Sequence, residues 1–241
     1  MVVECYFPGP IKDYPKQFVA WVVDVRPERC PHCGGEGCCI FWGCYLRWVY
    51  TATNKTQIWI MRIRCTRCKV TNALLPSFLH IFRRYTLVLI QQALYLVLDE
   101  GLWGVALVNA VAPYHQPAPS TLAEWVSAFV HSAQDWLRDW LQRALAALDP
   151  LTLPDPGRLP DHINAIPSTS SGQAPTATRR ETFSQGWQVL RLTETLYALT
   201  RARQPGLAFQ ADVLLAFLAA ALGTTGRPPR ILWPQAAACA P

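Results

Sequence analysis

The sequence predicts an α+β fold in which a small β domain precedes a mainly helical region. Two aromatic and β-branched runs, residues 40–50 and 57–64, flank a polar turn at residues 53–56, which is typical of a β-hairpin. Beyond residue 85, apolar residues recur every three or four positions, which is the spacing of amphipathic helices. The two patterns occupy different parts of the chain, so we expect the sheet and the helices to form separate regions.

The chain of 241 residues divides into four predicted regions. Residues 1–85 form the β domain with an N-terminal strand, and residues 86–149 form a three-helix region that ends in a long third helix. Residues 150–182 are rich in proline, serine and threonine, which is the composition of a linker. Residues 183–241 are expected to form a helical hairpin followed by a loose tail.

Local signals place the elements within these regions. Residues 16–25 are rich in β-forming side chains and predict a strand that leads toward the hairpin. A capping box, Thr121-x-x-Glu124, predicts the start of the third helix. The predicted helices cover residues 86–98, 102–111, 122–148, 183–203 and 207–222. The third helix carries one apolar stripe, made of Leu122, Val126, Phe129, Ala133, Trp136 and Trp140 and widened by Trp125, Leu137, Leu141 and Leu148.

Two Cys-x-x-Cys pairs stand at the two ends of the predicted hairpin: Cys30 with Cys33, and Cys65 with Cys68. Each pair presents two thiolates from one tight turn, and two such turns supply the four soft ligands of a tetrahedral zinc site. Because the four thiolates fill every coordination position, no place is left for a reactive water. The sequence therefore predicts a zinc ribbon with one structural zinc ion.

Other interpretations of the cysteines remain open. The two pairs could be unrelated thiols, or one could be a redox dithiol, although a thioredoxin-type motif expects a single pair in a βαβ setting. Three further cysteines follow the first pair closely and are expected to be buried as small apolar residues. They are Cys38, which could also compete for the metal, Cys39 and Cys44.

Charge is distributed unevenly, since no acidic residue occurs between Glu36 and Asp99. A surface of one sign attracts polyanions, among which phosphate backbones are the commonest, so this stretch predicts contact with duplex DNA. An ordinary solvated face is the alternative, although such faces usually mix both signs. The predicted phosphate contacts are Arg47, Arg62, Arg64, Arg67, Lys69, Arg83 and Arg84.

Several classes of protein are disfavoured. Nine cysteines, an odd number without a secretory signal, argue against a disulfide framework. No apolar run reaches the ~18 residues of a membrane span. We therefore expect a cytoplasmic protein without membrane contact. The sequence has no nucleophile elbow, no phosphate-binding loop and no His-Glu-x-x-His motif, so we expect no enzymatic activity.

Five linked motifs follow one another from residue 30: CPHC at 30–33, WGCYLRWV at 42–49, IMRIRCTRC at 60–68, LLPSFL at 74–79 and RRY at 83–85. They resemble a family of bacterial zinc-ribbon proteins described only as a domain of unknown function. Similar ribbons lie at the N-terminus of insertion-sequence transposases and their accessory proteins, where a helix-turn-helix commonly follows. The resemblance covers roughly residues 28–135. It implies that Ser120 and Thr121 begin a recognition helix and contact DNA.

Together these observations favour a zinc-stabilised DNA-binding accessory or regulatory protein of a mobile element. Its expected partners are duplex DNA and a transposase or recombinase. The alternative is a protein-interaction adaptor, in which the long tryptophan-rich helix and the C-terminal hairpin bind such a partner. The same long helix could pair two copies of the chain as a homodimer. RNA is a further alternative, because Trp42, Tyr45, Trp48 and Trp59 could stack bases, although core packing explains these aromatics more simply.

Overall fold

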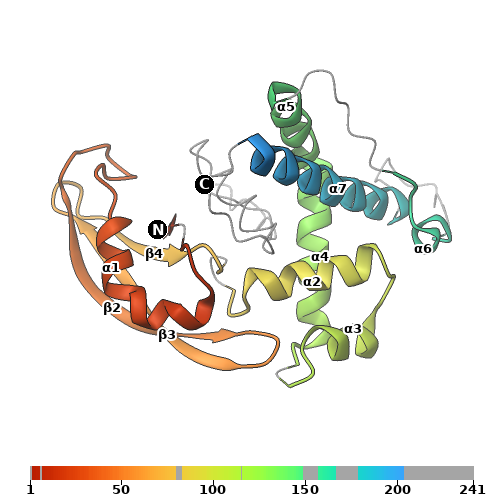
Figure 1. Cartoon of the computed structure of the whole chain (residues 1–241), viewed down its shortest axis with the longest axis horizontal. Coiled ribbons are helices and arrows are strands. Elements are labelled where there is room, and N and C mark those ends of the chain that lie inside the picture. Colours follow the sequence, from red (N-terminus) through yellow and green to blue (C-terminus); the bar gives the residue numbers. More distant parts are fainter. Residues whose placement is uncertain are drawn as a thin grey trace, which may run out of the picture. The chain divides into compact units, whose positions relative to one another are not determined.

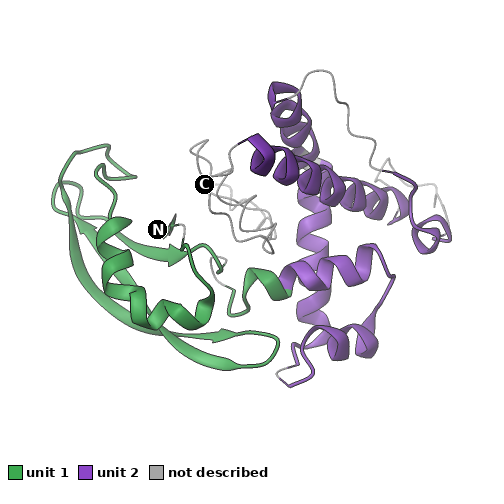
Figure 2. Cartoon of the chain, in the orientation of Figure 1, with its two compact units in different colours: residues 1–89, 210–228 green, residues 90–209, 229–241 purple. Residues whose placement is uncertain are grey.

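A computed structural model of the chain describes residues 2–5, 7–79, 83–114, 116–148, 157–166 and 179–203. The chain separates into two compact units, which comprise residues 1–89 and 90–209 of the part described (Figures 1 and 2). Among these residues, unit 1 contains a four-stranded sheet, one α-helix and the start of a second, whereas unit 2 contains helices. The predicted α+β fold is confirmed.

The sheet of unit 1 has the strand order β1-β4-β3-β2. Its strands are β1 (Val2–Cys5), β2 (Cys39–Tyr50), β3 (Lys55–Cys65) and β4 (Thr71–Pro76). β2 and β3 form the antiparallel hairpin that the sequence predicts. β4 is antiparallel to β3, whereas β1 pairs in parallel with β4. The hairpin is therefore extended on one side by two short strands that come from opposite ends of unit 1.

A short polar turn closes the hairpin and a bulge bends it. Thr51 Oγ1 accepts hydrogen bonds from the N–H groups of Thr53 and Asn54, at 3.3 and 2.9 Å. The Thr51 N–H donates to the Asn54 carbonyl at 2.8 Å. A β-bulge at Trp42 inserts one extra residue into β2. Bulges increase the local twist of a strand, so the long two-stranded ribbon is strongly twisted.

The strand predicted over residues 16–25 is wrong, because these residues belong to α1 (Tyr14–Asp24). Pro15 lies in the first turn, where its missing N–H leaves no hydrogen bond unmade. Val19 and Val23 are exposed, at 75% and 60% of their surface, and therefore do not form one side of a buried strand. The residues that α1 buries are Tyr14, Trp21 and Val22. Helical spacing of these side chains outweighs the β-propensity of the valines between them.

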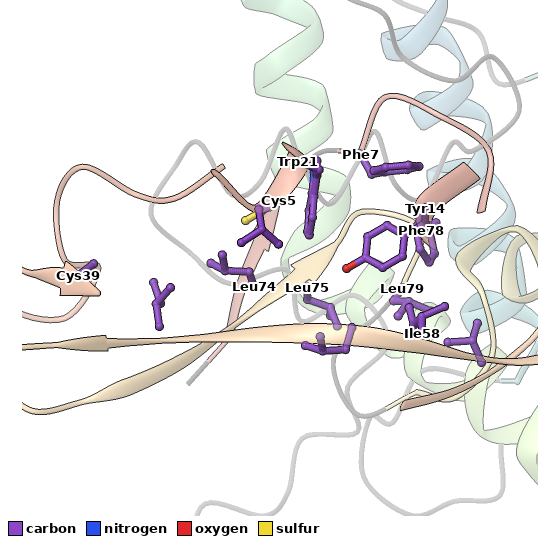
Figure 3. Packing of buried hydrophobic residues seen from close by; sticks show 14 of the residues in the cluster. Cys5, Phe7, Tyr14, Trp21, Cys39, Ile58, Leu74, Leu75, Phe78 and Leu79 are labelled. Carbon is purple, nitrogen blue, oxygen red and sulfur yellow. The ribbon is translucent and has the colours of Figure 1, made fainter. Parts of the chain in front are cut away.

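α1 lies over the sheet and closes the core of unit 1 (Figure 1). Four aromatic side chains meet there, as Figure 3 shows: Phe7, Tyr14, Trp21 and Phe78. Their ring centroids are 5.1–6.0 Å apart in edge-to-face arrangements, each worth about 0.5–1.5 kcal/mol beyond simple burial. The Tyr14 hydroxyl also donates a hydrogen bond to the Trp59 carbonyl of β3 at 2.9 Å. A short 3-10 helix, η1 (Ile11–Asp13), leads into α1.

Unit 2 is built from helices that pack on one another. The helices predicted over residues 86–98 and 102–111 are confirmed as α2, which begins in unit 1, and α3. No helix of the described ranges combines the length and the apolar composition that a membrane span needs. The helices are α2 (Leu87–Leu98), α3 (Gly104–Val111), α4 (Pro119–Ser132), α5 (Arg138–Leu148), α6 (Asp161–Asn164) and α7 (Arg179–Arg203).

The long third helix starts earlier than predicted. Pro119 begins α4, and its N-cap residue, Ala118, offers no side-chain hydrogen bond. Thr121 therefore lies inside the helix and not at its N-cap, so the predicted capping box with Glu124 is wrong. Proline is favoured in the first turn because its backbone angle is already helical, and here it determines the start of the helix.

The long helix is also interrupted by a π-helical turn, η2 (Ala133–Leu137), between α4 and α5. A π turn holds one residue more than an α-helical turn, so the side chains beyond it move to a different face. Trp136 and Trp140 of the predicted stripe are only half-buried. Of the residues predicted to widen the stripe, Trp125, Leu137 and Leu141 are fully buried and Leu148 is half-buried, and Leu145 is buried as well.

The predicted linker, residues 150–182, is described only in part. Within it, α6 packs against α7, and Ile163 of α6 is fully buried. α7 starts at Arg179, before the predicted residue 183, and packs against α4 and α5. The helix predicted over residues 207–222 and the tail lie outside the described residues, so the separate C-terminal hairpin stays a prediction.

Two kinds of contact hold α7 in unit 2. A Cβ added at Gly186 would lie 2.4 Å from Val130 Cγ1, so the backbone of α7 approaches α4 closely at this position. Nearby, Asp99, which follows α2, accepts hydrogen bonds from Trp187 Nε1 at 2.8 Å and from Arg191 Nη2 at 2.5 Å. The close approach and the shared carboxylate together fix the position of α7 along α4 and α2.

Candidate metal centre and basic hairpin surface

The first cysteine pair lies in a tight turn held by backbone hydrogen bonds. The Gly34 N–H donates to the Cys30 carbonyl, and the Cys30 N–H donates to the Gly35 carbonyl, both at 2.8 Å. Gly34 has a φ of 69°, a left-handed conformation that glycine adopts without strain. The turn brings the sulfurs of Cys30 and Cys33 together.

The second pair lies where β3 ends. The Lys69 N–H donates to the Cys65 carbonyl at 3.0 Å, which repeats the hydrogen bond made by Gly34 in the first turn. Lys69 also has a positive φ, 63°, which is uncommon for a residue with a side chain. The two Cys-x-x-Cys segments therefore adopt the same backbone turn, one before β2 and one after β3.

The first sulfur of each pair accepts hydrogen bonds from backbone N–H groups. Cys65 Sγ accepts from the N–H groups of Cys68 and Arg67, each at 3.3 Å. These contacts, foremost that of Cys68, lower the pKa of Cys65 to about 5 despite the burial that raises it. The pKa of Cys30 is likewise lowered, foremost by the Cys33 N–H. Such hydrogen bonds stabilise the thiolate, which is the form that binds metals.

The sulfurs of the two pairs face each other across the end of the hairpin. Cys33 Sγ lies 3.7 Å from Cys65 Sγ, and Cys30 Sγ lies 3.8 Å from Cys68 Sγ. Zinc–sulfur bonds of about 2.3 Å in a tetrahedron place the sulfurs about 3.8 Å apart. The two distances between the pairs therefore fit the edges of a tetrahedral four-thiolate metal site.

Cys38 brings a fifth thiol to this centre. Its Sγ lies 3.3 Å from Cys65 Sγ and 3.0 Å from the Gly35 carbonyl oxygen. The sulfurs of Cys30, Cys33, Cys38 and Cys65 all lie within 4.8 Å of one another, close enough to hold a metal ion. Of the predicted ligands, Cys30, Cys33 and Cys65 belong to this group, and Cys68 adjoins it through its contact with Cys30.

The hairpin register explains why Cys38 reaches the centre. Cys39, the first residue of β2, is paired with Cys65, the last residue of β3. The Cys38 carbonyl accepts a hydrogen bond from the Thr66 N–H at 2.7 Å, just beyond this pair. A residue one position before β2 must therefore lie next to the second cysteine turn. Aligning the two predicted strands in the sequence would have revealed this neighbour.

The pKa values of Cys38 and Cys68 are raised, in contrast to those of Cys30 and Cys65. The hydrogen bond between Cys38 and Cys65, followed by burial, raises the pKa of Cys38 to about 12. The Val70 N–H lowers the pKa of Cys68, but burial and the thiols of Cys65 and Cys30 outweigh it and raise this pKa to about 12. A metal that takes either thiol as a ligand must displace its proton, so metal binding releases protons here.

The remaining cysteines of the described residues are Cys5, Cys39 and Cys44, and the Cys39 thiol lies beside those of Cys30 and Cys38. Cys39 is buried as expected, and its burial raises the pKa of the thiol. Cys5 is also buried. The expectation for Cys44 is wrong, because its side chain is exposed in β2, opposite Met61. β2 is the outermost strand among the described residues, and most of its side chains remain exposed on both faces.

The predicted phosphate contacts of unit 1 form two groups. The first group, Arg47, Arg83 and Arg84, lies near the closed end of the hairpin. Arg47 donates a hydrogen bond from Nη2 to the Arg83 carbonyl, and its burial lowers the pKa of the guanidinium. The Tyr50 N–H donates to the Arg84 carbonyl at 2.8 Å, which ties residues 83–86 to the end of β2.

The second group lies at the metal end of the hairpin and consists of Arg62, Arg64, Arg67 and Lys69. Arg62 is exposed and is paired with Gly43 of β2. Arg67 packs close to Gly35, since its Cδ lies 3.3 Å from the position that a Cβ atom would take if Gly35 were alanine. Arg64 lies over the Trp42 ring, with its guanidinium carbon 4.4 Å from the centroid. Within the described ranges, none of these four side chains forms an ion pair with a carboxylate, and neither does Arg84.

Ser120 and Thr121, the predicted DNA contacts of the helical region, lie in the first turn of α4 in unit 2. Ser120 is exposed and Thr121 is half-buried. On the same helix Trp125 and Phe129 are fully buried. The apolar stripe of α4 is therefore used inside unit 2, and its exposed face begins with Ser120.

The range that carries both cysteine turns and the whole hairpin matches a known family. Residues 30–100 match a family model described as a domain of unknown function (DUF6431). No curated protein and no solved structure matches the chain. The predicted resemblance to a domain of unknown function is thus confirmed for a segment with a cysteine cluster, and the resemblance to transposase ribbons stays a prediction.

Proposed function

We propose that unit 1 binds zinc through its cysteine centre and that the metal acts as a structural staple. Soft thiolate ligands select zinc, copper(I) or iron–sulfur clusters over hard cations. The sulfur separations of 3.7 and 3.8 Å between the two pairs support a tetrahedral ion bound by four thiolates. Zinc supplies no redox chemistry and, with four protein ligands, offers no position to water, so its contribution is to the stability of the ribbon.

We further propose that the zinc-stabilised hairpin binds the phosphate backbone of duplex DNA. The observation that carries this proposal is the set of five cationic side chains without an acidic partner among the described residues: Arg62, Arg64, Arg67, Lys69 and Arg84. Cations that are not neutralised inside the protein create a positive surface potential. Neutralising DNA phosphates with such side chains releases condensed counterions, which provides the sequence-independent part of DNA affinity.

Arg47 has a different role in this proposal. Its guanidinium is half-buried and donates to the Arg83 carbonyl, so it orders the segment that carries Arg83 and Arg84. We therefore assign Arg47 to positioning this segment and the exposed basic residues to the phosphate contacts. Ser120 and Thr121 begin α4, and a helix N-terminus can approach either a phosphate or a base edge.

A role as an accessory or regulatory protein of a mobile element rests on the resemblance of residues 28–135 to the ribbons of insertion-sequence transposases. The alternative adaptor function has less support. Most of the apolar stripe of α4 and α5, from Leu122 to Leu145, is buried inside unit 2, and these buried side chains are not available to a recombinase or a second copy of the chain. The adaptor function would then depend on residues 204–222, outside the described ranges.

The direct test is the salt dependence of binding to a random-sequence duplex. If the basic surface contacts phosphates, the logarithm of the association constant falls linearly with the logarithm of salt concentration, by about 0.9 per contact. Replacing Arg62 and Arg67 by alanine should weaken binding to all duplexes alike and flatten the slope by about two units. The matched control is the double substitution of Arg143 and Arg201, which are exposed on unit 2.

The outcomes are distinct. An unchanged slope in the Arg62→Ala/Arg67→Ala variant would remove the phosphate role of the hairpin, even if the protein still binds DNA. Substitution of Ser120 or Thr121 by alanine is expected to change the preference among duplex sequences and to leave the slope unchanged. Absence of any duplex binding at low salt would end the DNA proposal in favour of the adaptor function.

A further inference from the structure

One face of the hairpin carries an exposed row of aromatic and apolar side chains. Side chains alternate along a strand, and residues directly opposite in an antiparallel pair share a face. The register pairs Leu46 with Trp59 and Trp48 with Gln57. We call this surface the aromatic face; its members are Cys44, Leu46, Trp48 and Tyr50 of β2 and Lys55, Gln57, Trp59 and Met61 of β3.

The aromatic face is open to solvent. Leu46, Trp48 and Trp59 are 46%, 43% and 45% exposed, although they are among the most apolar side chains of unit 1. Trp59 is one pair further along the strands than Trp48, on the other strand, so the two indoles are diagonal neighbours about 7–8 Å apart at their Cα positions. Contiguous exposed apolar side chains usually mark a binding surface.

Positive charge lies directly on this face. Lys55 Nζ is 4.4 Å from the centroid of the Trp48 ring and 5.4 Å from that of Tyr50. The Tyr50 ring in turn lies 5.1 Å from the Tyr85 ring, with 34° between their planes. Tyr85 follows Arg84, whose side chain is exposed. The row of aromatic rings therefore runs from Trp59 through Trp48 and Tyr50 to Tyr85. Lys55 lies along this row, and Arg84 lies at its end.

We propose that the aromatic face binds unpaired bases of a single nucleic-acid strand, which stack on Trp48 and Trp59 while Lys55 and Arg84 contact the flanking phosphates. This deepens the proposed DNA function, since it rests on the same basic hairpin. Every base has an apolar π face, so stacking on aromatic side chains holds single strands with little regard to sequence. In a duplex the base faces are stacked on one another inside the helix, so they cannot stack on Trp48 and Trp59.

The charges favour this occupant over a protein partner. No acidic residue occurs between Glu36 and Asp99, so the hairpin offers no carboxylate to a basic or mixed-charge partner. Lys55 Nζ lies over the Trp48 ring, 4.4 Å from its centroid, so a base that stacks on this ring face displaces the flexible lysine, whose ammonium then lies within reach of the phosphate of that base. The hairpin therefore combines exposed aromatic rings with cationic side chains, and single-strand binding sites use both.

The test compares a single-stranded oligothymidylate with a random-sequence duplex, using the full-length zinc-loaded protein. Trp48→Ala and Trp59→Ala are each expected to weaken single-strand binding by roughly 5–150-fold and to change duplex binding little. The conservative variants Trp48→Phe and Trp59→Phe keep an aromatic ring and should recover most of the affinity. Trp103→Ala is the matched control, because Trp103 is 40% exposed on unit 2.

A second readout separates stacking from simple charge attraction. An oligonucleotide of abasic sites has the same phosphates without bases, so it should bind the wild-type protein and both alanine variants equally. Equal affinity of wild type for oligothymidylate and the abasic strand would overturn the proposal while leaving the phosphate contacts intact. Loss of binding to all nucleic acids would refute the proposed DNA function itself.

A further outcome concerns protein partners. If Trp48→Ala changes the sedimentation of the protein and leaves single-strand affinity unchanged, the aromatic face is an interface between copies of the chain and the proposal is refuted. Zinc content and the far-ultraviolet circular dichroism spectrum of each variant show whether unit 1 has kept its fold. The phenylalanine variants keep the comparison decisive if an alanine variant fails to fold.

Discussion

The Sγ atoms of Cys38 and Cys65 lie 3.3 Å apart, closer than those of Cys33 and Cys65 at 3.7 Å. The thiols of Cys30, Cys33, Cys38, Cys65 and Cys68 therefore lie close together, whereas a tetrahedral metal ion takes only four ligands. The short contact is a hydrogen bond between the two sulfurs, whereas two thiolates on one zinc ion are held about 3.8 Å apart by their bonds to the metal. The separation of 3.8 Å between Cys30 and Cys68 meets that requirement.

The first prediction concerns the fourth ligand. We expect Cys38→Ser to keep one tightly bound zinc ion, and Cys68→Ser to weaken zinc binding by about tenfold or more, or about 1.4 kcal/mol. Cys38 can replace the missing thiolate in Cys68→Ser. Of these three variants, only the double variant Cys38→Ser/Cys68→Ser should therefore lose zinc altogether. Competition titrations against a zinc chelator measure the affinities, and cobalt substitution reports the number of thiolate ligands. An equal loss in the two single variants would mean that Cys38 and Cys68 contribute alike.

The second prediction concerns removal of the metal. The sheet of unit 1 is small, so the proposed zinc ion is expected to supply much of its folding energy, on the order of 10–16 kcal/mol for structural zinc sites. A chelator, or Cys65→Ser, should unfold residues 28–80 and leave the helices of unit 2 intact. Circular dichroism should lose its β component and keep its helical signal, and protease should cut within β2 and β3. Unchanged protection of the hairpin after complete zinc removal would contradict the prediction.

Much of unit 1 could be predicted from the sequence because its signals are local. The spacing within each cysteine pair and the polar turn at residues 53–56 led to the correct hairpin. Along one face of β3, Ile58 and Ile60 are buried and Arg62 is exposed, so the burial of this face ends before the second cysteine turn. Cys38 was recognised only as a competitor for the metal, because its position depends on the register of two strands and not on spacing along the chain.

Other features depend on packing that a local pattern does not contain. Residues 16–25 have the valine content of a strand, but burial of Tyr14 and Trp21 under the aromatic cluster selects a helix. β1 is paired by β4, which is far away in the sequence. The π turn at residues 133–137 leaves no signature in the amino-acid composition. A regular 3.6-residue period therefore placed Trp136 on the stripe and Leu137 at its margin, whereas the structure buries Leu137 fully and Trp136 only in part.

The third prediction concerns the contact between α7 and α4. Gly186→Ala should destabilise unit 2 by about 1–3 kcal/mol, because the added methyl group would overlap Val130. The side chain of valine is stiff in a helix and cannot turn away. In a Val130→Ala background the overlap is gone, and Gly186→Ala should then be neutral or stabilising by up to about 1 kcal/mol, since alanine favours helices.

The four proteins to compare are the wild type, Gly186→Ala, Val130→Ala and the double variant. Urea denaturation, followed by the helical circular dichroism signal, gives the free energy of unfolding of each and hence the coupling free energy between the two positions. Ser184→Ala, at a half-buried position two residues away, is the control for an alanine substitution in α7. Additive effects of Gly186→Ala and Val130→Ala would mean that the two helices can separate at this point without cost.

The fourth prediction concerns alkaline pH. Burial, followed by the hydrogen bond that the Tyr95 hydroxyl donates to Glu194, raises the pKa of Tyr95. The unfolded chain releases this proton near pH 10, whereas the folded chain retains it to higher pH. The folded state thus binds more protons in this range, so the free energy of unfolding falls as the pH rises above about 10.

Tyr95→Phe removes this titration. We expect its stability to decline less steeply between pH 10 and 11 than that of the wild type, by about 1 kcal/mol per pH unit or less after solvent screening. Denaturant titrations at a series of pH values measure the difference, and Tyr114→Phe, at a side chain 75% exposed, is the control. If the free energy of unfolding declines equally with pH in the wild type and in Tyr95→Phe, the hydroxyl has the same pKa in the folded and unfolded states and the prediction is wrong.

The parallel pairing of β1 with β4 has a consequence during synthesis. Val2 and Val3 meet their partners in β4 about seventy positions later in the chain, and at ~5–20 residues per second a ribosome takes roughly 4–14 s to reach them. During that interval β1 has an open edge that other nascent chains can pair with. Closing the cysteine pairs around zinc would bring the hairpin into register as β4 emerges. The zinc supply of the translating cell would then determine whether the new chain completes its own sheet or aggregates.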